Sequence, residues 1–401
     1  MPTSALSTTP SRRTLGDVVG GRHNAYGIIR FVLASLVIVD HAFPLGGFGR
    51  DPFWRLTGDQ ESLGGLAVAG FFIVSGFLIA RSAMSNDLIG FLWRRILRIM
   101  PAFWLCLAVS ALAIGPWIYH MQHDTLLGYF TRGAGGPVAY LVNNAALEVG
   151  QYGILDVFLP TPYGQQVQAS VFNGSLWTLI YEFRCYLILG LLAAFGVLAR
   201  ARSLVPVMAA VFVVLGAVHP AAEPILTTMA PWLGDIQFVR LTGLFLLGSA
   251  AAVYPERVPL DGRLALGALF VAAGSLFYSG GFHFVGVPAM AYVTLWFAYC
   301  APRSLFAFGA RNDYSYGIYI YGFLVQQVLA ALGWQRLGVL AYIVAAWLLT
   351  LGCAVVSWHL LEKPALQLKD WGPGKGLGHL LERRGGAGPG ADRGLDRVNP
   401  I

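Results

Sequence analysis

The sequence predicts an all-α polytopic membrane protein with about ten transmembrane helices and both termini in the cytoplasm. Hydrophobic residues make up 56% of the 401 residues, charged residues only 12%, and the mean hydropathy is +0.62. A soluble protein of this length needs a charged surface that this composition does not supply. The apolar runs are long enough, at roughly 17 to 25 residues, to cross a bilayer as helices. The period-2 alternation that a membrane β-barrel requires is not sustained anywhere in the sequence.

Ten apolar runs are long enough to count as candidate spans. They lie near residues 26–44, 64–83, 100–118, 177–198, 203–219, 237–254, 262–279, 284–301, 314–332 and 338–360. A further segment near 137–149 is too short and too polar to cross a bilayer.

The orientation of these spans follows from the basic residues in the connections between them. One alternating set of connections is rich in Lys and Arg: Arg12, Arg13, Arg22, Arg81, Arg94, Arg95, Arg98, Arg200, Arg202, Arg257, Arg263, Arg303, Arg311, Lys363 and Lys369. The other set contains Arg50, Arg55, Arg132 and Arg336. This asymmetry places both termini inside and explains the net charge of +7 as topology. We expect no nucleic-acid binding, because the basic residues are spread over separate short loops.

The chain divides into one membrane domain and two tails. We expect residues 1–24 to be a disordered cytoplasmic tail, residues 25–366 to form the membrane domain, and residues 367–401, rich in Gly and Arg, to be a second disordered tail. Neither end is expected to carry a further folded domain. The long connection 119–176 is expected outside, either as a lid over the bundle or as a re-entrant segment.

The cysteines and loop histidines do not have the spacing of metal ligands. The four cysteines are isolated inside predicted spans, and His120 and His123 have no third ligand nearby in the sequence. We therefore expect the cysteines to be small core residues, without a structural disulfide and without a metal site.

The first span carries polar residues at both ends, in the stretch R-F-V-L-A-S-L-V-I-V-D-H. Arg30 and His41 are eleven residues apart, close to three helical turns, so both lie on one helix face roughly 16 Å apart. Arg30 is placed near the cytoplasmic end and His41 towards the outer end. Simpler interpretations stay open: Arg30 as a snorkelling anchor and His41 as an interfacial residue.

Another polar residue in a span is Glu182, which follows Trp177 in an apolar helix. Acidic residues inside the membrane are rare and usually functional. Arg184 is two residues away and does not face Glu182 on a helix. We therefore expect Glu182 either to orient His41 or to hold the structure together through an arginine of another span.

Several short motifs follow one another in the order of a known family. They are F-F-I-V-S-G-F at 71–77, W-R-R-I-L-R at 93–98, S-L-W-T-L-I-Y-E-F-R at 175–184, Y-S-Y-G-I-Y at 314–319 and L-L-E-K-P at 360–364. Together with the Arg-x10-His spacing of Arg30 and His41, they resemble acyltransferase family 3, polytopic bacterial enzymes that acylate surface carbohydrates. The resemblance covers about residues 24–366. Two positions depart from it: Ala69 replaces a frequent acidic residue, and Gly322 replaces a frequent histidine.

The resemblance implies an O-acyltransferase that uses acyl-CoA, with acetyl-CoA expected, and no metal. His41 would be the catalytic base for the acceptor hydroxyl, although an acyl-histidine intermediate is chemically possible as well. Arg95 and Arg98, with Arg94, would clamp the phosphates of the donor, since guanidinium groups pair bidentately with phosphate. Arg30 would help to hold the donor. For Arg94, anchoring at the cytoplasmic surface is an equally natural role.

The resemblance also suggests an acceptor and a location. The acceptor would be a cell-surface or exported carbohydrate, as a polysaccharide or a lipid-linked repeat unit, and the protein would lie among the lipids of the bacterial inner membrane. Trp177, Tyr316, Tyr319 and Ser75 are the residues that we expect along the substrate path. Packing, interfacial and backbone-bonding roles are the alternatives for them. Two other functions stay open: acylation of a small molecule or lipid, and transport, although the two halves show no clear internal repeat. The oligomeric state and the acyl length are left open.

Overall fold

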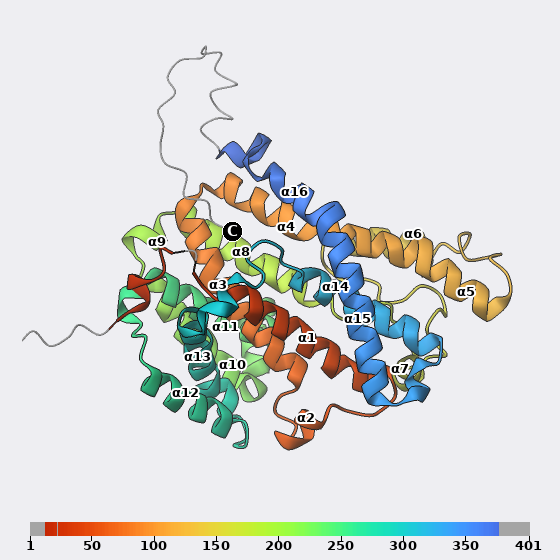
Figure 1. The fold of residues 1–401 in the computed structure, drawn as a ribbon, viewed down its shortest axis with the longest axis horizontal. Coiled ribbons are helices and arrows are strands. Elements are labelled where there is room, and N and C mark those ends of the chain that lie inside the picture. The colour runs from red at the N-terminus through yellow and green to blue at the C-terminus, as the bar shows by residue number, and fades with distance from the viewer. Residues whose placement is uncertain (1–12, 22, 377–401) are drawn as a thin grey trace, which may run out of the picture.

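The computed structural model describes residues 13–21 and 23–376, and every regular element within these ranges is helical (Figure 1). Ten helices lie at the ten predicted spans: α1 (Tyr26–Leu45), α3 (Leu63–Ser85), α4 (Leu88–Val109), α8 (Thr178–Ala194), α10 (Leu204–Met229), α11 (Ile236–Val253), α12 (Gly262–Ser275), α13 (Val287–Cys300), α14 (Ser315–Ala331) and α15 (Val339–Ser357). Shorter elements between them include α2 (Pro52–Leu56), α6 (Pro137–Asn144), α7 (Pro162–Val167), η4 (Pro255–Arg257), η5 (Phe282–Gly286), η8 (Trp358–Glu362) and α16 (Lys363–Gln367).

The helix lengths confirm a multi-pass, all-helical class. Seven helical segments in the described ranges are long and apolar enough to cross a membrane. Of the other three, α8 and α14 have 17 residues each and α12 has 14. The count of about ten spans and the cytoplasmic side of the termini stay predictions.

The third helix is much longer than the sequence suggested. We expected a span at 100–118, whereas α4, a π-helical turn at Ser110–Ile114 and α5 (Gly115–His123) form a continuous 36-residue segment. Asp87 begins it by accepting a hydrogen bond from the amide of Gly90 at 2.7 Å. Hydropathy alone excluded the arginine-rich first turns, but the helix tolerates them because arginines there find partners in the protein.

Helices α3 and α11 form the centre of the bundle. A Cβ on Gly76 would lie 1.8 Å from the carbonyl oxygen of Phe245, and one on Gly248 would lie 2.0 Å from that of Ile73. The two backbones therefore touch directly, as small residues allow between membrane helices. In their most apolar stretches, 61% of α3 and 72% of α11 is buried, against 22% for the segments that contain α10 and α15.

Helix α14 is the second buried helix, and it packs against α1 and α15. Its polar residues Gln326 and Gln327 are fully buried. Their side-chain amides donate to the carbonyl oxygens of Ile38 at 2.8 Å and Val171 at 2.6 Å. These bonds tie α14 to α1 and to the segment that precedes α8, since a buried amide needs such partners.

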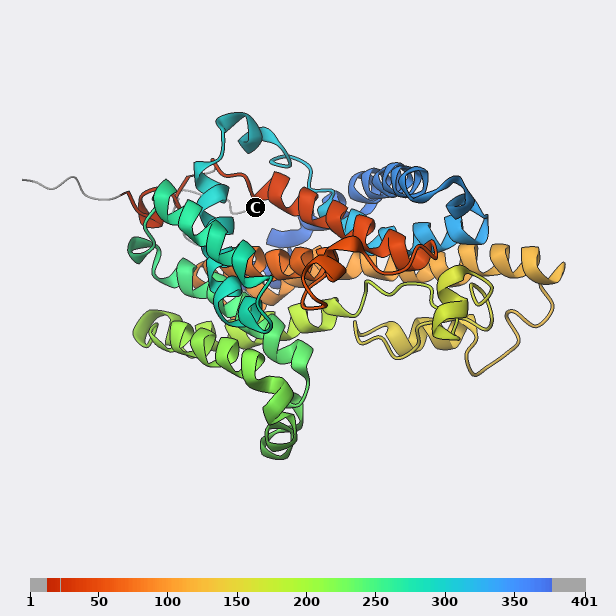
Figure 2. The same ribbon diagram turned by 90° about the horizontal axis from the view of Figure 1, so that it is seen from below.

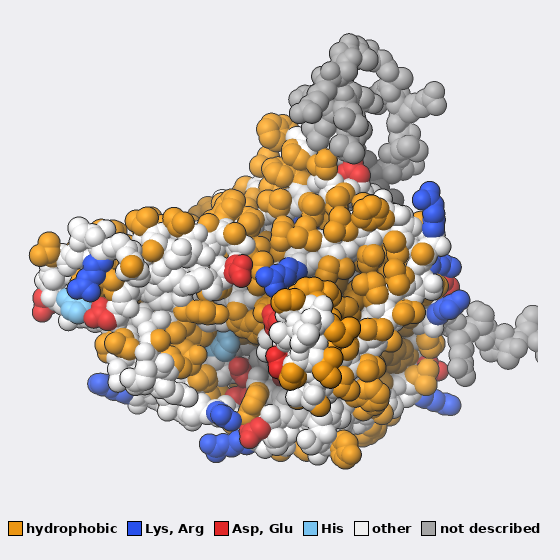
Figure 3. All heavy atoms as spheres, turned by 180° about the vertical axis from the view of Figure 1, so that it is seen from behind, with side chains coloured by type: hydrophobic (Ala, Val, Ile, Leu, Met, Phe, Trp, Pro, Cys, Tyr) orange, Lys and Arg blue, Asp and Glu red, His pale blue; other side chains and the backbone are white. Residues whose placement is uncertain are grey.

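The outer helices present apolar side chains outward. Examples on α10, α12 and α15 are Val207, Val211, Val214, Val218, Leu266, Leu269, Phe270, Leu340, Val344 and Leu348. Figure 3 shows one face that is largely hydrophobic, with Lys and Arg side chains mainly towards its margins. An apolar surface of this extent suits contact with lipid rather than water.

The long connection after α5 is compact. Figure 2 shows it beside the α4–α5 segment, at one end of the molecule. Trp104 of α4 donates to the carbonyl oxygen of Ala145 at 3.0 Å, and α7 packs against α1. Four aromatic side chains in it are fully buried: Tyr129, Tyr140, Phe158 and Phe172. The connection thus shares the hydrophobic core of the bundle, and its last residues lead into the cavity described below.

The tails are more ordered near the membrane domain than we predicted. Leu15 is fully buried, and its amide donates to the carbonyl oxygen of Val258 at 2.8 Å, so the expectation of disorder is wrong for residues 13–21. Beyond α16, the indole of Trp93 donates to the carbonyl oxygen of Leu368 at 3.0 Å. Residues 1–12, 22 and 377–401 lie outside the described residues.

Candidate active site

Four charged residues from four parts of the chain meet at one end of the bundle, and we call them the arginine cluster: Arg30, Arg98, Asp313 and Glu362. Arg30 and Arg98 both form an ion pair with the same carboxylate oxygen of Asp313, Arg98 at 2.7 Å. Arg98 also pairs with Glu362 at 3.4 Å. The cluster joins α1, α4, the start of α14 and the turn after α15.

Electrostatics and packing both hold the arginine cluster in place. Burial raises the pKa of the Asp313 carboxyl, but Arg30, Arg98 and Ser315 lower it more, so its net shift is downward. The hydroxyl of Ser315 donates to Asp313 at 2.5 Å. The Arg98 guanidinium also lies 5.5 Å from the ring centres of Tyr316 and Trp358. Asp313 is therefore ionised at neutral pH, and its single negative charge is shared by two arginines.

The other two arginines of the predicted phosphate clamp behave differently from Arg98. Arg94 pairs with the exposed Asp370 at 2.8 Å, which fits an anchor at the surface. The Nε atom of Arg95 is buried and has no hydrogen-bond partner among the described residues. Arg95 interacts electrostatically with Glu182 and Tyr186 of α8. The Nε atom of Arg94 is likewise buried without a partner, so what distinguishes Arg95 is that, among the described residues, it alone of the three clamp arginines forms no ion pair.

Glu182 lies in a group of its own with Ser75 and Tyr186. Its carboxylate accepts hydrogen bonds from the Ser75 hydroxyl at 2.9 Å and from the Tyr186 hydroxyl. Glu182 and Tyr186 are four residues apart, on one face of α8. Neither bond involves His41, so in this structure Glu182 links α3 and α8 and does not orient the imidazole. Ser75 bonds to Glu182 and not, as one alternative held, to a backbone carbonyl of its own helix.

His41 lines a cavity of about 320 Å³ towards the far end of α1. The polar lining comes from many elements: Asp40, His41, Trp54, Gln60, Glu61, Ser62, Ser175, Trp177, Gln237, Arg240, His283 and Tyr319. The His41 ring also meets Phe323 of α14 edge to face, with centroids 5.3 Å apart. His41 is therefore held by packing at the wall of a polar cavity.

Three buried polar atoms of the cavity lining have no hydrogen-bond partner among the described residues. They are Nδ1 of His41, Nε1 of Trp54 and Oγ of Ser175. Buried polar groups are nearly always paired in native proteins, so a cluster of unpaired ones marks a place where a ligand or water binds.

The four predicted path residues separate into three places, because Ser75 belongs to the Glu182 group described above. Trp177 and Tyr319 line the cavity, and the Tyr319 hydroxyl lies 2.5 Å from that of Thr178. Tyr316 does not line it: its hydroxyl donates to the carbonyl oxygen of Ile99 at 2.8 Å, and its ring lies beside Arg98. Three residues along a helix correspond to about 4.5 Å. That rise is enough to place Tyr316 at the arginine cluster and Tyr319 at the cavity.

The two positions that depart from the family pattern, Ala69 and Gly322, lie on α3 and α14. Ala69 lines the cavity. A Cβ on Gly322 would lie 3.1 Å from Cγ1 of Ile38, so α14 passes close to α1 there. A histidine at 322 has no room in this packing.

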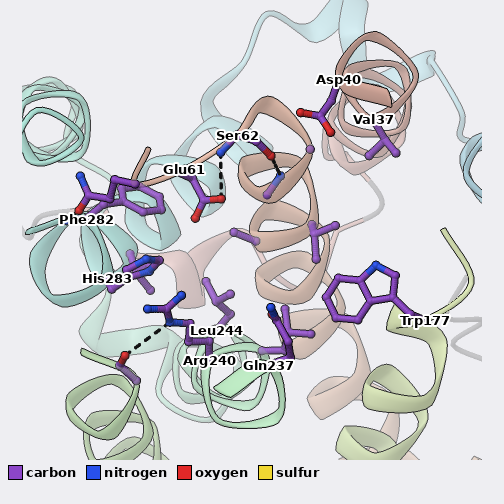
Figure 4. A pocket seen from close by; sticks show the side chains of 18 of the residues that line it. Val37, Asp40, Glu61, Ser62, Trp177, Gln237, Arg240, Leu244, Phe282 and His283 are labelled. Atoms are coloured by element: carbon purple, nitrogen blue, oxygen red, sulfur yellow. Dashed lines mark hydrogen bonds between the residues drawn. The ribbon is translucent and has the colours of Figure 1, made fainter. Parts of the chain in front are cut away.

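Sequence reasoning missed several charged residues of these regions. Asp313 directly precedes a predicted span, on the side where the basic connections are predicted to lie, and this was a signal that could have been used. Glu61, Arg240 and His283 are far apart in the sequence and belong to no recognised motif. Only the fold brings them to one cavity (Figure 4).

Comparison with known proteins identifies the family of the chain. A family model described as an acyltransferase domain matches residues 24–359. The chain is 28% identical over 353 residues to an O-acetyl transferase of Shigella phage Sf6, covering 85% of this chain and 96% of that protein. It is 28% identical over 383 residues to nodulation protein 10 of Rhizobium leguminosarum bv. viciae, covering 87% and 95%. No solved structure matches the chain.

The matched region runs from just before α1 to the turn after α15, and so contains His41, the Glu182 group and nearly all of the arginine cluster. A motif order, a helical architecture and a family match over most of the chain lead to one conclusion: the chain belongs to acyltransferase family 3.

Proposed function

We propose that this protein is an integral-membrane O-acyltransferase that transfers an acetyl group from cytoplasmic acetyl-CoA to a hydroxyl of a cell-surface or exported carbohydrate. One observation carries the proposal. His41 lines a polar cavity, and Arg30 of the arginine cluster lies about three turns away on the same helix, so α1 connects the arginine cluster with a site suited to a hydroxyl acceptor.

His41 acts as the base in this proposal. It accepts the proton of the acceptor hydroxyl while the hydroxyl oxygen attacks the thioester carbonyl. The new ester bond forms as the carbon–sulfur bond breaks, and the thiolate leaves with the electron pair. General-base catalysis of this kind contributes about 10²–10⁴-fold. Attack by His41 itself, through an acyl-histidine, is the alternative route.

The donor end is built from the arginines. Arg95 is the foremost phosphate ligand, because it forms no ion pair among the described residues, whereas Arg94 pairs with Asp370 and Arg98 with Asp313. Arg98 and Arg30 are already paired with Asp313 and Glu362, so they support the donor end in a fixed position and leave phosphate binding chiefly to Arg95. A second cavity of about 550 Å³, lined by Gly27, Phe31 and residues 307–315, lies next to this cluster and offers room for entry.

We infer that the arginine cluster faces the cytoplasm and that the protein lies in the inner membrane of a bacterium. The basic connections support this orientation, since Lys and Arg concentrate on the cytoplasmic side of membrane proteins. A cytoplasmic donor then meets the cluster first, and the acceptor reaches His41 from the other side. The relative named as an O-acetyl transferase supports acetyl as the group and oxygen as its destination.

The proposal is tested by the ester content of surface polysaccharide in the organism that encodes the chain. Proton NMR would compare wild type, a deletion, and the deletion complemented with wild type or His41→Ala at matched protein levels. We expect acetyl signals to disappear in the deletion, to return with wild type, and to stay absent with His41→Ala. Signals that persist in the deletion would exclude this polysaccharide as acceptor and favour a small molecule or lipid.

A further inference from the structure

The wall of the cavity farthest from α1 carries three charged or titratable side chains that the chemistry above does not use. Glu61 comes from the loop before α3, Arg240 from α11 and His283 from η5. Figure 4 shows them facing a common space, with Asp40 and Trp177 on the other side. We call Glu61, Arg240 and His283 the far wall.

Neighbouring residues fix Glu61 in position. The side-chain amide of Gln60 donates to the carbonyl oxygen of Leu276 at 2.8 Å, and its oxygen accepts from the amide of Phe282 at 3.0 Å. On the other side, the Ser62 hydroxyl caps α3 by accepting from the amide of Gly65 at 2.9 Å. Glu61 is therefore held between two anchored residues, and its carboxylate is directed into the cavity.

Arg240 is held by its stem, while its terminal nitrogens are left for a ligand. Its Nε donates to the carbonyl oxygen of Gly216 at 3.5 Å, and a Cβ on Gly216 would lie 3.2 Å from Cγ of Arg240. Although Arg240 and Glu61 attract each other electrostatically, no ion pair joins them within residues 13–21 and 23–376. Because these two oppositely charged side chains are held apart across the cavity, their donors and acceptors can bind a molecule that lies between them.

Unpaired polar atoms elsewhere in the cavity lining point to the same conclusion. Nδ1 of His41, Nε1 of Trp54 and the hydroxyl of the almost fully buried Ser175 also lack partners among the described residues. A ligand that fits must therefore offer several donors and acceptors around its edge. A sugar ring does so, and the indole of Trp177 adds an apolar surface with a polar edge.

The charge and size of the cavity narrow the ligand further. When Glu61 is ionised, two carboxylates, Asp40 and Glu61, face one guanidinium, so an anionic ligand would meet more repulsion than attraction. The volume of about 320 Å³ lies at the small end of the range for ligand sites, which suits one ring rather than a chain of rings.

We propose that the far wall binds the acceptor, and that the acceptor unit is a single neutral monosaccharide residue held between Glu61, Arg240 and His283 with one hydroxyl at His41. This assignment rests on the proposed transfer to a carbohydrate. It adds which residues select the acceptor and which class of sugar they select.

The test uses the full chain in lipid nanodiscs, with radiolabelled acetyl-CoA and a panel of methyl hexosides and methyl hexuronides as acceptor probes. We expect Glu61→Gln and Arg240→Gln each to raise the KM for the preferred hexoside by about tenfold or more, because hydrogen bonds to charged groups are among the strong ones. The kcat and the KM for acetyl-CoA should change less than about threefold, since a wall that only binds the acceptor does not touch the donor.

Matched controls lie outside the cavity. Glu256 and Arg202 form a half-exposed pair at 3.9 Å, so Glu256→Gln and Arg202→Gln should leave both KM values unchanged. If Glu61→Gln does not fold, as judged by size-exclusion chromatography, Arg240→Gln and His283→Ala decide the question by the same readout.

The outcomes separate the two proposals. Acceptor KM values that stay within twofold of wild type, while wild type transfers acetyl groups, would overturn the far wall and leave the proposed function standing. A preference for hexuronides would overturn the neutral class. If wild type acetylates no glycoside and no extracted surface polysaccharide, the carbohydrate function itself is wrong.

Discussion

The two ends of α1 differ in how their polar groups are satisfied. At the arginine cluster, Arg30, Arg98, Asp313 and Glu362 pair with one another, and aromatic rings cover Arg98. In the His41 cavity, polar groups face an open space and several buried atoms have no partner among the described residues. The charged groups of the arginine cluster satisfy one another, whereas the polar groups of the cavity are left for a ligand to satisfy.

This difference separates structural roles from binding roles among residues of the same chemical type. Removing one member of a buried ion-pair network leaves an uncompensated charge, and the fold suffers. Removing a group that faces an empty cavity changes binding or catalysis and costs the fold little. Substitutions in the arginine cluster should therefore lower the free energy of unfolding, and substitutions in the cavity should change kcat or KM.

The largest expected effect is on catalysis at the cavity. His41→Ala should lower kcat/KM for acetyl transfer by about 10²–10⁴-fold, because the acceptor hydroxyl loses its base. Thermal unfolding should change little, since the His41 ring makes no hydrogen bond through Nδ1 within the described residues. The exposed His120, replaced in His120→Ala, is the matched control and should behave as wild type. Activity in His41→Ala within tenfold of wild type would remove His41 from the chemistry.

The next effect is on stability at the arginine cluster. Asp313→Ala should lower the free energy of unfolding by about 3 kcal/mol, because two arginines whose side chains are only 25% and 15% exposed lose their shared partner. Asp313→Asn should lower the free energy of unfolding nearly as much, because asparagine keeps the shape of the side chain but not its negative charge. Thermal unfolding in detergent micelles measures both. A transition temperature equal to that of wild type would mean that the cluster is not the closed unit described here.

A smaller effect is expected from the pH dependence of acceptor binding. Burial raises the pKa of Glu61 to about 7, although the Ser62 amide and Arg240 pull it down and Asp40 pushes it up. His283 faces the same space. Sugar hydroxyls donate to the ionised carboxylate, so the acceptor KM should fall by about tenfold as the ionised fraction rises between pH 6 and pH 8.

Glu61→Gln supplies the control for this pH dependence. The amide does not titrate, so the fall in acceptor KM should vanish, while any pH dependence of kcat that arises from His41 persists. The same KM profile in wild type and Glu61→Gln would assign the titration to another group.

The sequence was sufficient for the features that are local in the chain. Hydropathy located helices at all ten expected positions, and the eleven-residue spacing correctly placed Arg30 and His41 on one helix at two different levels. The family resemblance, carried by short motifs, is confirmed by the match over residues 24–359. Each of these depends on residues within a few turns of one another.

What the sequence did not show depends on contacts between distant segments. Asp313 is 283 residues from Arg30 and 215 from Arg98, and no periodicity reports such a pair. Tyr316 and Tyr319 look equivalent in the sequence, but one helical turn places them beside different neighbours. Glu182 was assigned to His41 or to an arginine, and the serine and tyrosine that bind it became visible only with the packing of α3 on α8.

The smallest expected effect tests whether the stability of the arginine cluster depends on burial of its ion pairs and not on charge alone. Arg94 and Asp370 also form an ion pair, at 2.8 Å, but the Asp370 side chain is 67% exposed. Asp370→Ala should therefore lower the free energy of unfolding by less than about 1 kcal/mol, and raised salt should abolish the difference, because water and ions screen an exposed pair. Thermal unfolding of Asp370→Ala and Asp313→Ala under identical conditions gives the comparison. If both variants lose the same stability, burial does not distinguish the two pairs, and the contrast between a closed arginine cluster and its exposed neighbour fails.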